Sequence, residues 1–186
     1  MEEKVKFFQG LDPQNKCEEL SENHDIAIEL ETISLSEYSP GIVKSSEYIA
    51  RMIFSPLHIE ENGTIKPSAF SDVKDKGLSV HRLNYIRCKE LESLGKTMAS
   101  NANTAGRSER DYIGYVRAHT TEIRQLTVDN KRLFCVYDTA KETKRSHADV
   151  CAVFLDEQQD PQLSKKAANK RRRKRLQELF STLISC

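Results

Sequence analysis

The fold is decided by the stretch YIGYVRAHTTEIRQLTVDNKRLFCVYDTA, residues 112–140. Its two halves are rich in the β-branched and aromatic residues that are typical of strands. Between them stands Asp129-Asn130-Lys131, which we interpret as a three-residue hairpin connection. After the polar turn KETKRSH (141–147), the segment ADVCAVFLD (148–156) predicts a final strand. Antiparallel strand pairing is therefore the expected basis of the fold.

Earlier segments supply further expected elements. The alternation of HDIAIELETISL (24–35) predicts a first strand that starts near Asp25. EYIARMIF (47–54) fits a helical turn or a strand equally well, and Pro56 ends it in either case. Asn62-Gly63 predicts the turn of a hairpin in LHIEENGTIKPSAF (57–70).

A strand followed by a helix is expected next. KGLSVHRL (76–83) predicts a short strand, and RLNYIRCKELESLG (82–95) predicts a helix that Gly95 stops. Residues 96–110 are small and polar, and predict a loop or a frayed continuation of that helix.

A chain of 186 residues suits one domain. We predict an α+β fold with a mainly antiparallel sheet and one or two packed helices. An irregular, acidic lead-in is expected over 1–24, the α+β domain over 25–156, and a basic, amphipathic C-terminal helix over 157–186, with Ser164 as its cap.

The charge of the chain is divided between its ends. The formal net charge is only +1, yet residues 161–186 hold eight Lys or Arg and one acid, a net of +7. Residues 1–48 hold eleven acids and four Lys, a net of −7. Such asymmetry bears on partners and solubility rather than on fold.

The basic run KKAANKRRRKR (165–175) has two main interpretations. It contacts the phosphate backbone of a nucleic acid nonspecifically, or it is a solvated face that pairs with the chain's own acidic segment. A nuclear-import signal is a further option. The candidate nucleic-acid contacts are Lys165, Lys166, Lys170, Arg171, Arg172, Arg173, Lys174 and Arg175.

Behind the basic run, an apolar face is expected on the same helix. Packing on the chain's own sheet is the favoured role for this face, and insertion into a partner is the alternative. The face comprises Leu176, Leu179, Phe180, Leu183 and Ile184.

A second candidate site lies at the ends of the predicted strands. Ser79 and His81 alternate onto one face, and His147-Ala148-Asp149 places a carboxylate two residues from an imidazole. If their strands are neighbours, His81, His147 and Asp149 can serve as acid, base or ligand toward a phosphate- or nucleotide-containing substrate. The more common role of such residues is to cap turns, so this enzymatic reading is the alternative. The histidine spacing gives no metal motif, and we expect no cofactor.

Several function classes lack support. The sequence contains no GxxxxGK[ST], GxGxxG, HExxH or GxSxG motif. Five widely spaced cysteines without a CxxC pair argue against a disulfide framework, and Cys17 and Cys186 are the two expected to be exposed. With no signal-peptide run and no apolar stretch of spanning length, we expect reduced thiols in a cytoplasmic protein without a membrane partner.

The strings GLSVHR (77–82), DTA (138–140) and SHADV (146–150) resemble strings found in small bacterial proteins that accompany defence or mobile-element genes. The likeness covers the middle half of the chain and assigns no residue a role. It implies a bacterial, defence-related setting. We therefore expect a noncatalytic accessory or adaptor subunit that contacts nucleic acid or a larger protein subunit. A pure protein–protein module, docking through the acidic residues 1–48, is a further alternative.

Overall fold

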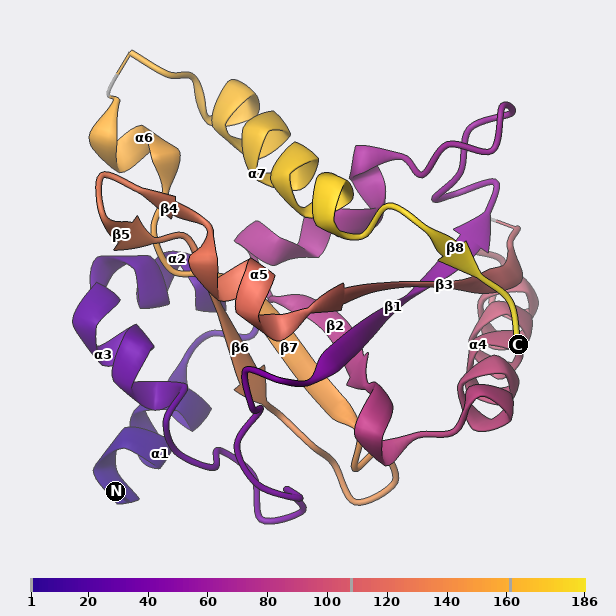
Figure 1. Ribbon diagram of the computed structural model, residues 1–186, viewed down its shortest axis with the longest axis horizontal. Helices are drawn as coiled ribbons and strands as arrows, with labels where there is room; N and C mark the ends of the chain where they lie inside the picture. Colours follow the sequence, from indigo (N-terminus) through magenta and orange to yellow (C-terminus); the bar gives the residue numbers. More distant parts are fainter. Residues whose placement is uncertain (1, 108, 161) are drawn as a thin grey trace.

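Six strands form one antiparallel sheet in the order β6-β7-β2-β1-β3-β8 (Figure 1). The computed structural model describes residues 2–107, 109–160 and 162–186. The strands are β1 (Tyr48–Ser55), β2 (Leu78–Arg82), β3 (Asp111–His119), β6 (Phe134–Asp138), β7 (His147–Ala152) and β8 (Leu183–Ile184). A separate two-stranded ribbon pairs β4 (Thr127–Val128) with β5 (Lys131–Arg132). The α+β prediction is confirmed.

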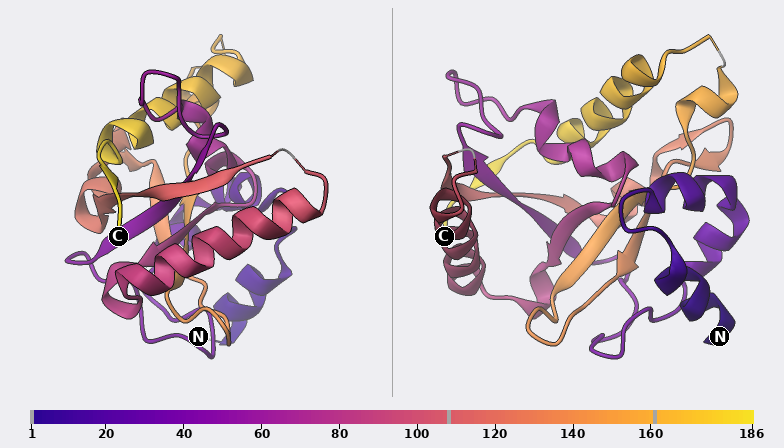
Figure 2. Two further views of the ribbon diagram at one scale, coloured as in Figure 1. Left: turned by 90° about the vertical axis from the view of Figure 1, so that its right-hand side faces the viewer. Right: turned by 180° about the vertical axis from the view of Figure 1, so that it is seen from behind.

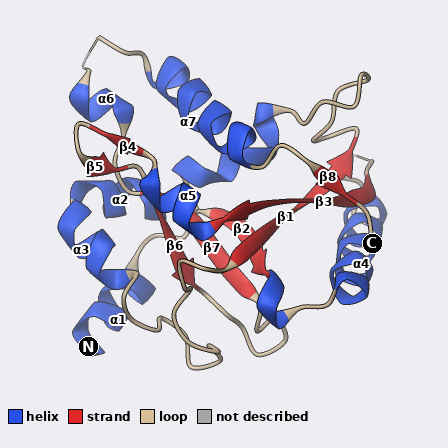
Figure 3. Cartoon of the chain, viewed as in Figure 1, coloured by secondary structure: helices blue, strands red, loops and turns tan. Residues whose placement is uncertain are grey.

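Helices surround this sheet (Figure 3). They are α1 (Glu2–Gly10), α2 (Lys16–Glu22), α3 (His24–Leu30), α4 (Cys88–Thr104), α5 (Thr120–Gln125), α6 (Asp156–Gln159) and α7 (Lys165–Leu179). Two 3₁₀ segments, η1 (Pro67–Lys74) and η2 (Leu83–Tyr85), complete the elements. Among the described residues, no helix has both the length and the apolar character needed to cross a membrane.

Each face of the sheet has its own core. On one face, Val80 and Val150 of the central strands pack in a cluster that also contains Leu176 of α7 and Phe70 of η1. The opposite face is covered by α1–α3 at one end, through residues such as Leu20, and by α4 at the other end (Figure 2). Leu78 pairs with Val150 in this register, and both belong to the first core. Because side chains alternate along a strand, the polar residues that alternate with them on β2 and β7, such as Ser79 and Asp149, point to the second face. The two helical groups thus flank the polar middle of the sheet.

The first expected strand is a helix. HDIAIELETISL contains α3, in which Ala27 and Leu30 are buried while Ile26 is 38% exposed. Burial at i and i+3 is the helical pattern, and tertiary packing of this face decides against the local alternation. The acidic lead-in is not irregular either, because it forms α1 and α2, whose Phe8 and Leu20 pack against the sheet.

Three further local predictions concern the segment that forms β1 and the turns at Gly63 and at Asp129-Asn130. EYIARMIF forms β1, which is buried on both faces and therefore lacks a clean alternation. Gly63 forms the turn, with φ of +83°, but only the bridge Ile59 to Ile65 closes the expected hairpin. The predicted three-residue connection Asp129-Asn130-Lys131 is wrong, because Lys131 pairs with Val128. The turn has two residues, Asp129 and Asn130, with φ of 47° and 61°.

Three expected helix or strand limits were wrong. Gly95 does not stop α4, which runs on to Thr104, and its missing Cβ leaves room for the ring of Tyr112. The strand expected in the first half of 112–140 ends at His119, where α5 begins. Helix α7 begins at the Ser164 cap, whose hydroxyl accepts from the Ala167 amide, but it ends before Leu183 and Ile184, which form β8. Met1, Ser108 and Pro161, within the expected lead-in, loop and C-terminal segment, lie outside the described residues.

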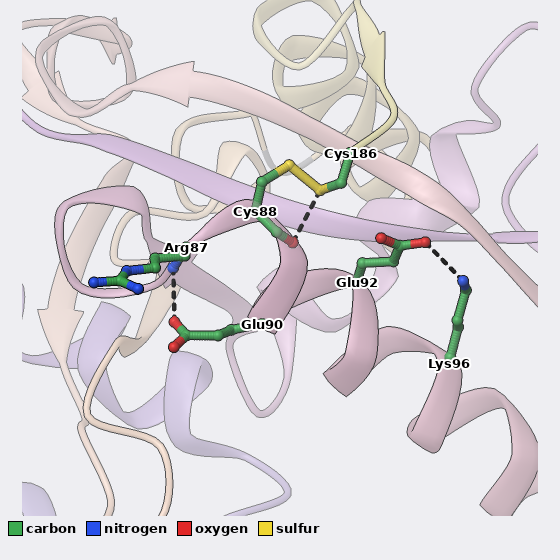
Figure 4. The surroundings of a disulfide bond; sticks show 6 residues. All are labelled: Arg87, Cys88, Glu90, Glu92, Lys96 and Cys186. Carbon is green, nitrogen blue, oxygen red and sulfur yellow. Dashed lines mark hydrogen bonds and ion pairs between the residues drawn. A yellow bond between two sulfur atoms is a disulfide. The ribbon is translucent and has the colours of Figure 1, made fainter.

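The cysteines also differ from expectation. Cys88 at the start of α4 and Cys186 at the chain end form a disulfide, so these two thiols are not free (Figure 4). Cys17, expected to be exposed, is fully buried, as are the free thiols of Cys135 and Cys151. The sequence spacing of 98 residues gave no sign of the pairing because only folding brings the two ends together.

Candidate functional site

Helix α7 has one face fixed to the protein. Leu176 and Phe180 are fully buried, and the Phe180 ring packs 5.5 Å from that of Phe70. Leu179 packs partly buried against the same core, whereas Leu183 is 36% exposed on β8. The apolar residues of the helix are thus used for packing on the chain's own core, the option that the sequence favoured.

Three of the eight predicted phosphate contacts turn toward the protein. Arg172 is 1% exposed and lies 3.5 Å from Asp156, whose other oxygen accepts from Arg175 at 2.6 Å. Arg173 donates to the Asn169 carbonyl and to the Ser71 hydroxyl. A buried guanidinium cannot reach a phosphate backbone, so Arg172 in particular is corrected from a nucleic-acid contact to an anchor of α7.

The other five cations of α7 remain on the surface. Lys165, Lys166, Lys170, Arg171 and Lys174 are exposed, and within the described ranges none of them forms an ion pair. Lys166, Lys170 and Lys174 follow one another at intervals of four residues, which places them on one stripe, each about 6 Å from the next along the axis. Like charges so spaced repel one another.

The acidic N-terminal residues do not neutralise this stripe. Glu31 binds Arg124 at 2.9 Å and Arg132 at 2.5 Å, and Glu47 binds Arg82. Helix α7 instead takes its carboxylate from Asp156. The predicted solvated pairing between the two ends of the chain is therefore not seen among the described residues.

The central strands bring the predicted histidines together. His81 of β2 and His147 of β7 are register partners, with ring centroids 6.0 Å apart, and Ser79 is opposite Asp149. The pairing of β2 with β7 meets the condition that the sequence left open. His81 is 3% exposed and bonded to the Ser146 hydroxyl, 3.0 Å from its Nδ1, so it lies behind the surface.

His147 and Asp149 reach a cavity of about 590 Å³. The cavity lies where α1 and α2 approach β2 and β7, and Ser79 and Lys16 also line it. His147 Nε2 lies 3.2 Å from the Ser79 hydroxyl and 3.8 Å from Asp149 Oδ1. The size is in the range of small-molecule sites.

Lys16 completes this group from a distant part of the sequence. Its ammonium donates to Asp149 Oδ2 at 2.7 Å and lies 5.4 Å from the centre of the Phe8 ring. Gly77 permits the close approach, because a Cβ there would meet Cys151 Sγ at 2.8 Å and the Lys16 side chain at 3.4 Å. The sequence carries no signal for Lys16, which stands in a polar segment without a pattern.

Burial sets the protonation of the histidines. Desolvation lowers the pKa of His147, although Asp149 opposes this, and it lowers the pKa of His81 to about 4 with help from the His147 charge. Both rings are therefore neutral at pH 7. A neutral imidazole can accept a proton, which is what a general base requires.

No group of three or more His, Cys, Asp or Glu among the described residues is arranged to hold a metal ion. No family model, curated protein or solved structure matches this chain. Its function must therefore be inferred from the cationic face of α7 and from the cavity.

Proposed function

We propose that this protein is an accessory or adaptor subunit of a larger assembly and contacts nucleic acid nonspecifically through the outward face of α7. The setting that we propose is bacterial and defence-related, because the strings GLSVHR, DTA and SHADV resemble strings in small bacterial proteins that accompany defence or mobile-element genes. The observation that carries the proposal is a set of exposed cations on this helix that form no ion pair with the described residues, while the opposite face of the helix is anchored in the core. The set is Lys165, Lys166, Lys170, Arg171 and Lys174.

The electrostatics of α7 favour an external polyanion. Its first turn holds Lys165 and Lys166 and no acid, although the helix dipole disfavours cations at that end. The stripe Lys166, Lys170 and Lys174 adds repulsion at i,i+4 spacing, and none of the three lysines forms an ion pair with a carboxylate of the described residues. Phosphates placed along the stripe would convert this repulsion into attraction. Counterion release then adds to affinity at low salt.

The anchoring of α7 makes this face a defined surface. Arg172 and Arg175 hold Asp156, and Gln177 donates to the Ile65 carbonyl at 2.5 Å. The helix therefore presents its cations from a fixed position and loses little conformational freedom on binding. No contact to a base edge follows from such a surface, so binding is expected to be independent of sequence.

The test measures binding of a fluorescent 20-base-pair duplex at several salt concentrations. Wild type is expected to show a log–log slope of about −4.5, because about five phosphates are neutralised. The variant Lys166→Gln/Lys170→Gln/Lys174→Gln should bind at least about tenfold more weakly at low salt, with a slope flatter by about 3.

A matched control removes three cations from α4 and the residues after it. The substitutions Lys89→Gln, Lys96→Gln and Arg107→Gln change the net charge equally and are also exposed. Unchanged affinity in the α7 variant, or an equal loss in the control, would sink the proposal. Copurification of a protein partner that survives nuclease treatment and the α7 substitutions would favour the pure protein–protein module instead.

A further inference from the structure

Two serine–histidine pairs lie next to each other on β2 and β7. Ser146 pairs with His81 and both are buried, at 4% and 3% exposure. Ser79 pairs with His147, but Ser79 is exposed and lines the cavity of about 590 Å³. The second pair is therefore accessible to a ligand, and the first is a natural internal control.

The proton positions of the exposed pair follow from its partners. His147 Nδ1 lies 3.1 Å from the carbonyl oxygen of Thr139, which can only accept, and 2.9 Å from the Thr139 hydroxyl. Nδ1 of the neutral ring therefore carries the hydrogen. Nε2 is left with its lone pair and accepts the hydrogen bond that the Ser79 hydroxyl donates across 3.2 Å. A serine hydroxyl that donates to an imidazole is arranged to lose its proton to that ring.

Asp149 is placed to stabilise a positive charge on His147, and Lys16 holds Asp149 in position. If Nε2 takes a proton, the ring becomes a cation, and Asp149 Oδ1 lies 3.8 Å from that nitrogen. Its other oxygen is held by the Lys16 ammonium, so the carboxylate has a fixed position. The histidine is thus fixed on one side by a backbone carbonyl and flanked on the other by a carboxylate.

The walls of the cavity indicate the kind of substrate. The lining is mixed. Phe8, Leu11 and Leu35 are apolar and Tyr38 is aromatic, whereas Lys16, Lys76, Lys141 and Glu37 are charged. A small ester can place its carbonyl and its acyl chain against such a mixed surface. The polar groups then face the reacting carbonyl.

We propose that Ser79 is a nucleophile, with His147 as its general base, that accepts the acyl group of a small carboxylic ester. Ser79 Oγ forms a bond to the carbonyl carbon while its proton passes to His147 Nε2. The bond from that carbon to the alcohol oxygen then breaks, and the alcohol leaves with the proton from Nε2. Water repeats the sequence on the acyl-serine, which releases the carboxylic acid and restores Ser79.

This proposal does not rest on the proposed nucleic-acid contact. Ser79 and His147 alternate with Val80 and Ala148, which belong to the core that α7 covers, so the cavity opens on the other face of the sheet. A chain with a reactive serine would differ from the noncatalytic subunit that the sequence suggested. Either proposal can fail without the other.

The first test uses an alkyl fluorophosphonate and intact-protein mass spectrometry on the full chain at pH 8. Reaction joins Ser79 Oγ to phosphorus, expels fluoride and passes the serine proton to His147. One adduct is expected, located on Ser79 by peptide mapping and absent from Ser79→Ala. His147→Gln should slow labelling by about 100-fold, the usual effect of losing a general base.

Ser146→Ala is the matched control, because it removes the buried member of the other pair and should leave labelling unchanged. The second test is hydrolysis of p-nitrophenyl butyrate, in which wild type should release p-nitrophenolate in a burst of one equivalent and Ser79→Ala should show none. Absence of an adduct in wild type, an adduct at another residue, or equal rates in wild type and Ser79→Ala would overturn the proposal. If His147→Gln does not fold, the comparison of wild type, Ser79→Ala and Ser146→Ala still decides.

Discussion

Arg82 and Glu47 form a two-pronged ion pair in the interior of the protein, with Nε to Oε2 at 2.8 Å and Nη2 to Oε1 at 2.7 Å. The side chains are 0% and 1% exposed. The guanidinium also donates to the carbonyl of Gly41 at 2.6 Å and stacks 4.5 Å from the centre of the Tyr85 ring. Burial opposes ionisation of Glu47, but the hydrogen bonds from Arg82 hold its pKa below the usual value. The pair fixes the loop before β1 to the end of β2.

Replacing Arg82 with Met should destabilise the protein strongly. The substitution leaves Glu47 buried without its cation, which costs about 3–5 kcal/mol in comparable pairs. Urea denaturation measures the loss. The double variant Arg82→Met/Glu47→Met should recover part of it, because the buried Glu47 carboxylate is removed as well. Recovery is incomplete because Asp138, whose Oδ1 lies 3.4 Å from Arg82 Nη1, still loses its cation. Wild-type stability in Arg82→Met would show that the pair is dispensable.

Stability should rise between pH 4 and pH 6.5. Burial lowers the pKa of His58 and of His81 to about 4, so in this range the unfolded chain binds protons that the folded chain does not. Each ring adds up to about 1.4 kcal/mol per pH unit to the free energy of unfolding as pH rises, and the contribution is complete above the unfolded value. Urea titrations at several pH values test this.

The assignment to buried histidines is tested by removing them one at a time. His81→Gln and His58→Gln should each flatten the pH profile, and the double variant should flatten it further. Equal slopes for wild type and His81→Gln would contradict the assignment to buried histidine.

Gly95→Ala should destabilise the protein even though Ala favours helices. A Cβ at Gly95 would lie 2.2 Å from an atom of the Tyr112 ring, so the ring must move. Overpacking of this kind costs about 1–3 kcal/mol, which exceeds the gain of about 1 kcal/mol from helix propensity. Gly10→Ala, with nothing within 4 Å of the added Cβ, is the control and should be neutral or slightly stabilising. Thermal unfolding of both variants distinguishes the effects.

Reduction of Cys88–Cys186 should lower the free energy of unfolding. The bond closes a loop of 98 residues, and crosslinks of this kind contribute about 2–5 kcal/mol. Its loss also frees the end of the chain beside β8, which pairs with β3 through only Leu183 and Ile184. Denaturation with and without dithiothreitol measures the effect. Cys88→Ser/Cys186→Ser should match the reduced wild type and show no further response to the reductant.

Parts of the fold were predictable because the local pattern and the tertiary environment agree. GLSVHR places Leu78 and Val80 on an apolar face and Ser79 and His81 on a polar one, and β2 has this arrangement. The Ser164 cap and the apolar spacing of Leu176 and Phe180 likewise predicted α7. The strand prediction for HDIAIELETISL was wrong because a short apolar run fits both the period of a strand and that of a helix. The burial of Ala27 and Leu30 against the sheet selects the helix.

The residues of the candidate site at the cavity were also only partly predictable from the sequence. The sequence placed His147 and Asp149 on one face, since residues two apart on a strand share a face. Their approach to His81 depended on the pairing of β2 with β7, which the sequence left open. Lys16 could not be found, because it lies 133 residues from Asp149 and only the packing of α2 on β7 joins them.

The sequence by itself determined the α+β class, the strands around GLSVHR and ADVCAVFLD, and a cationic helix at the end of the chain. These depend on periodicity and composition, which are local properties. Only the tertiary structure decided which cations of α7 remain on the surface, which serine meets a histidine at a cavity, and which cysteines join. Burial, register and contact between distant segments exist only after the chain has folded.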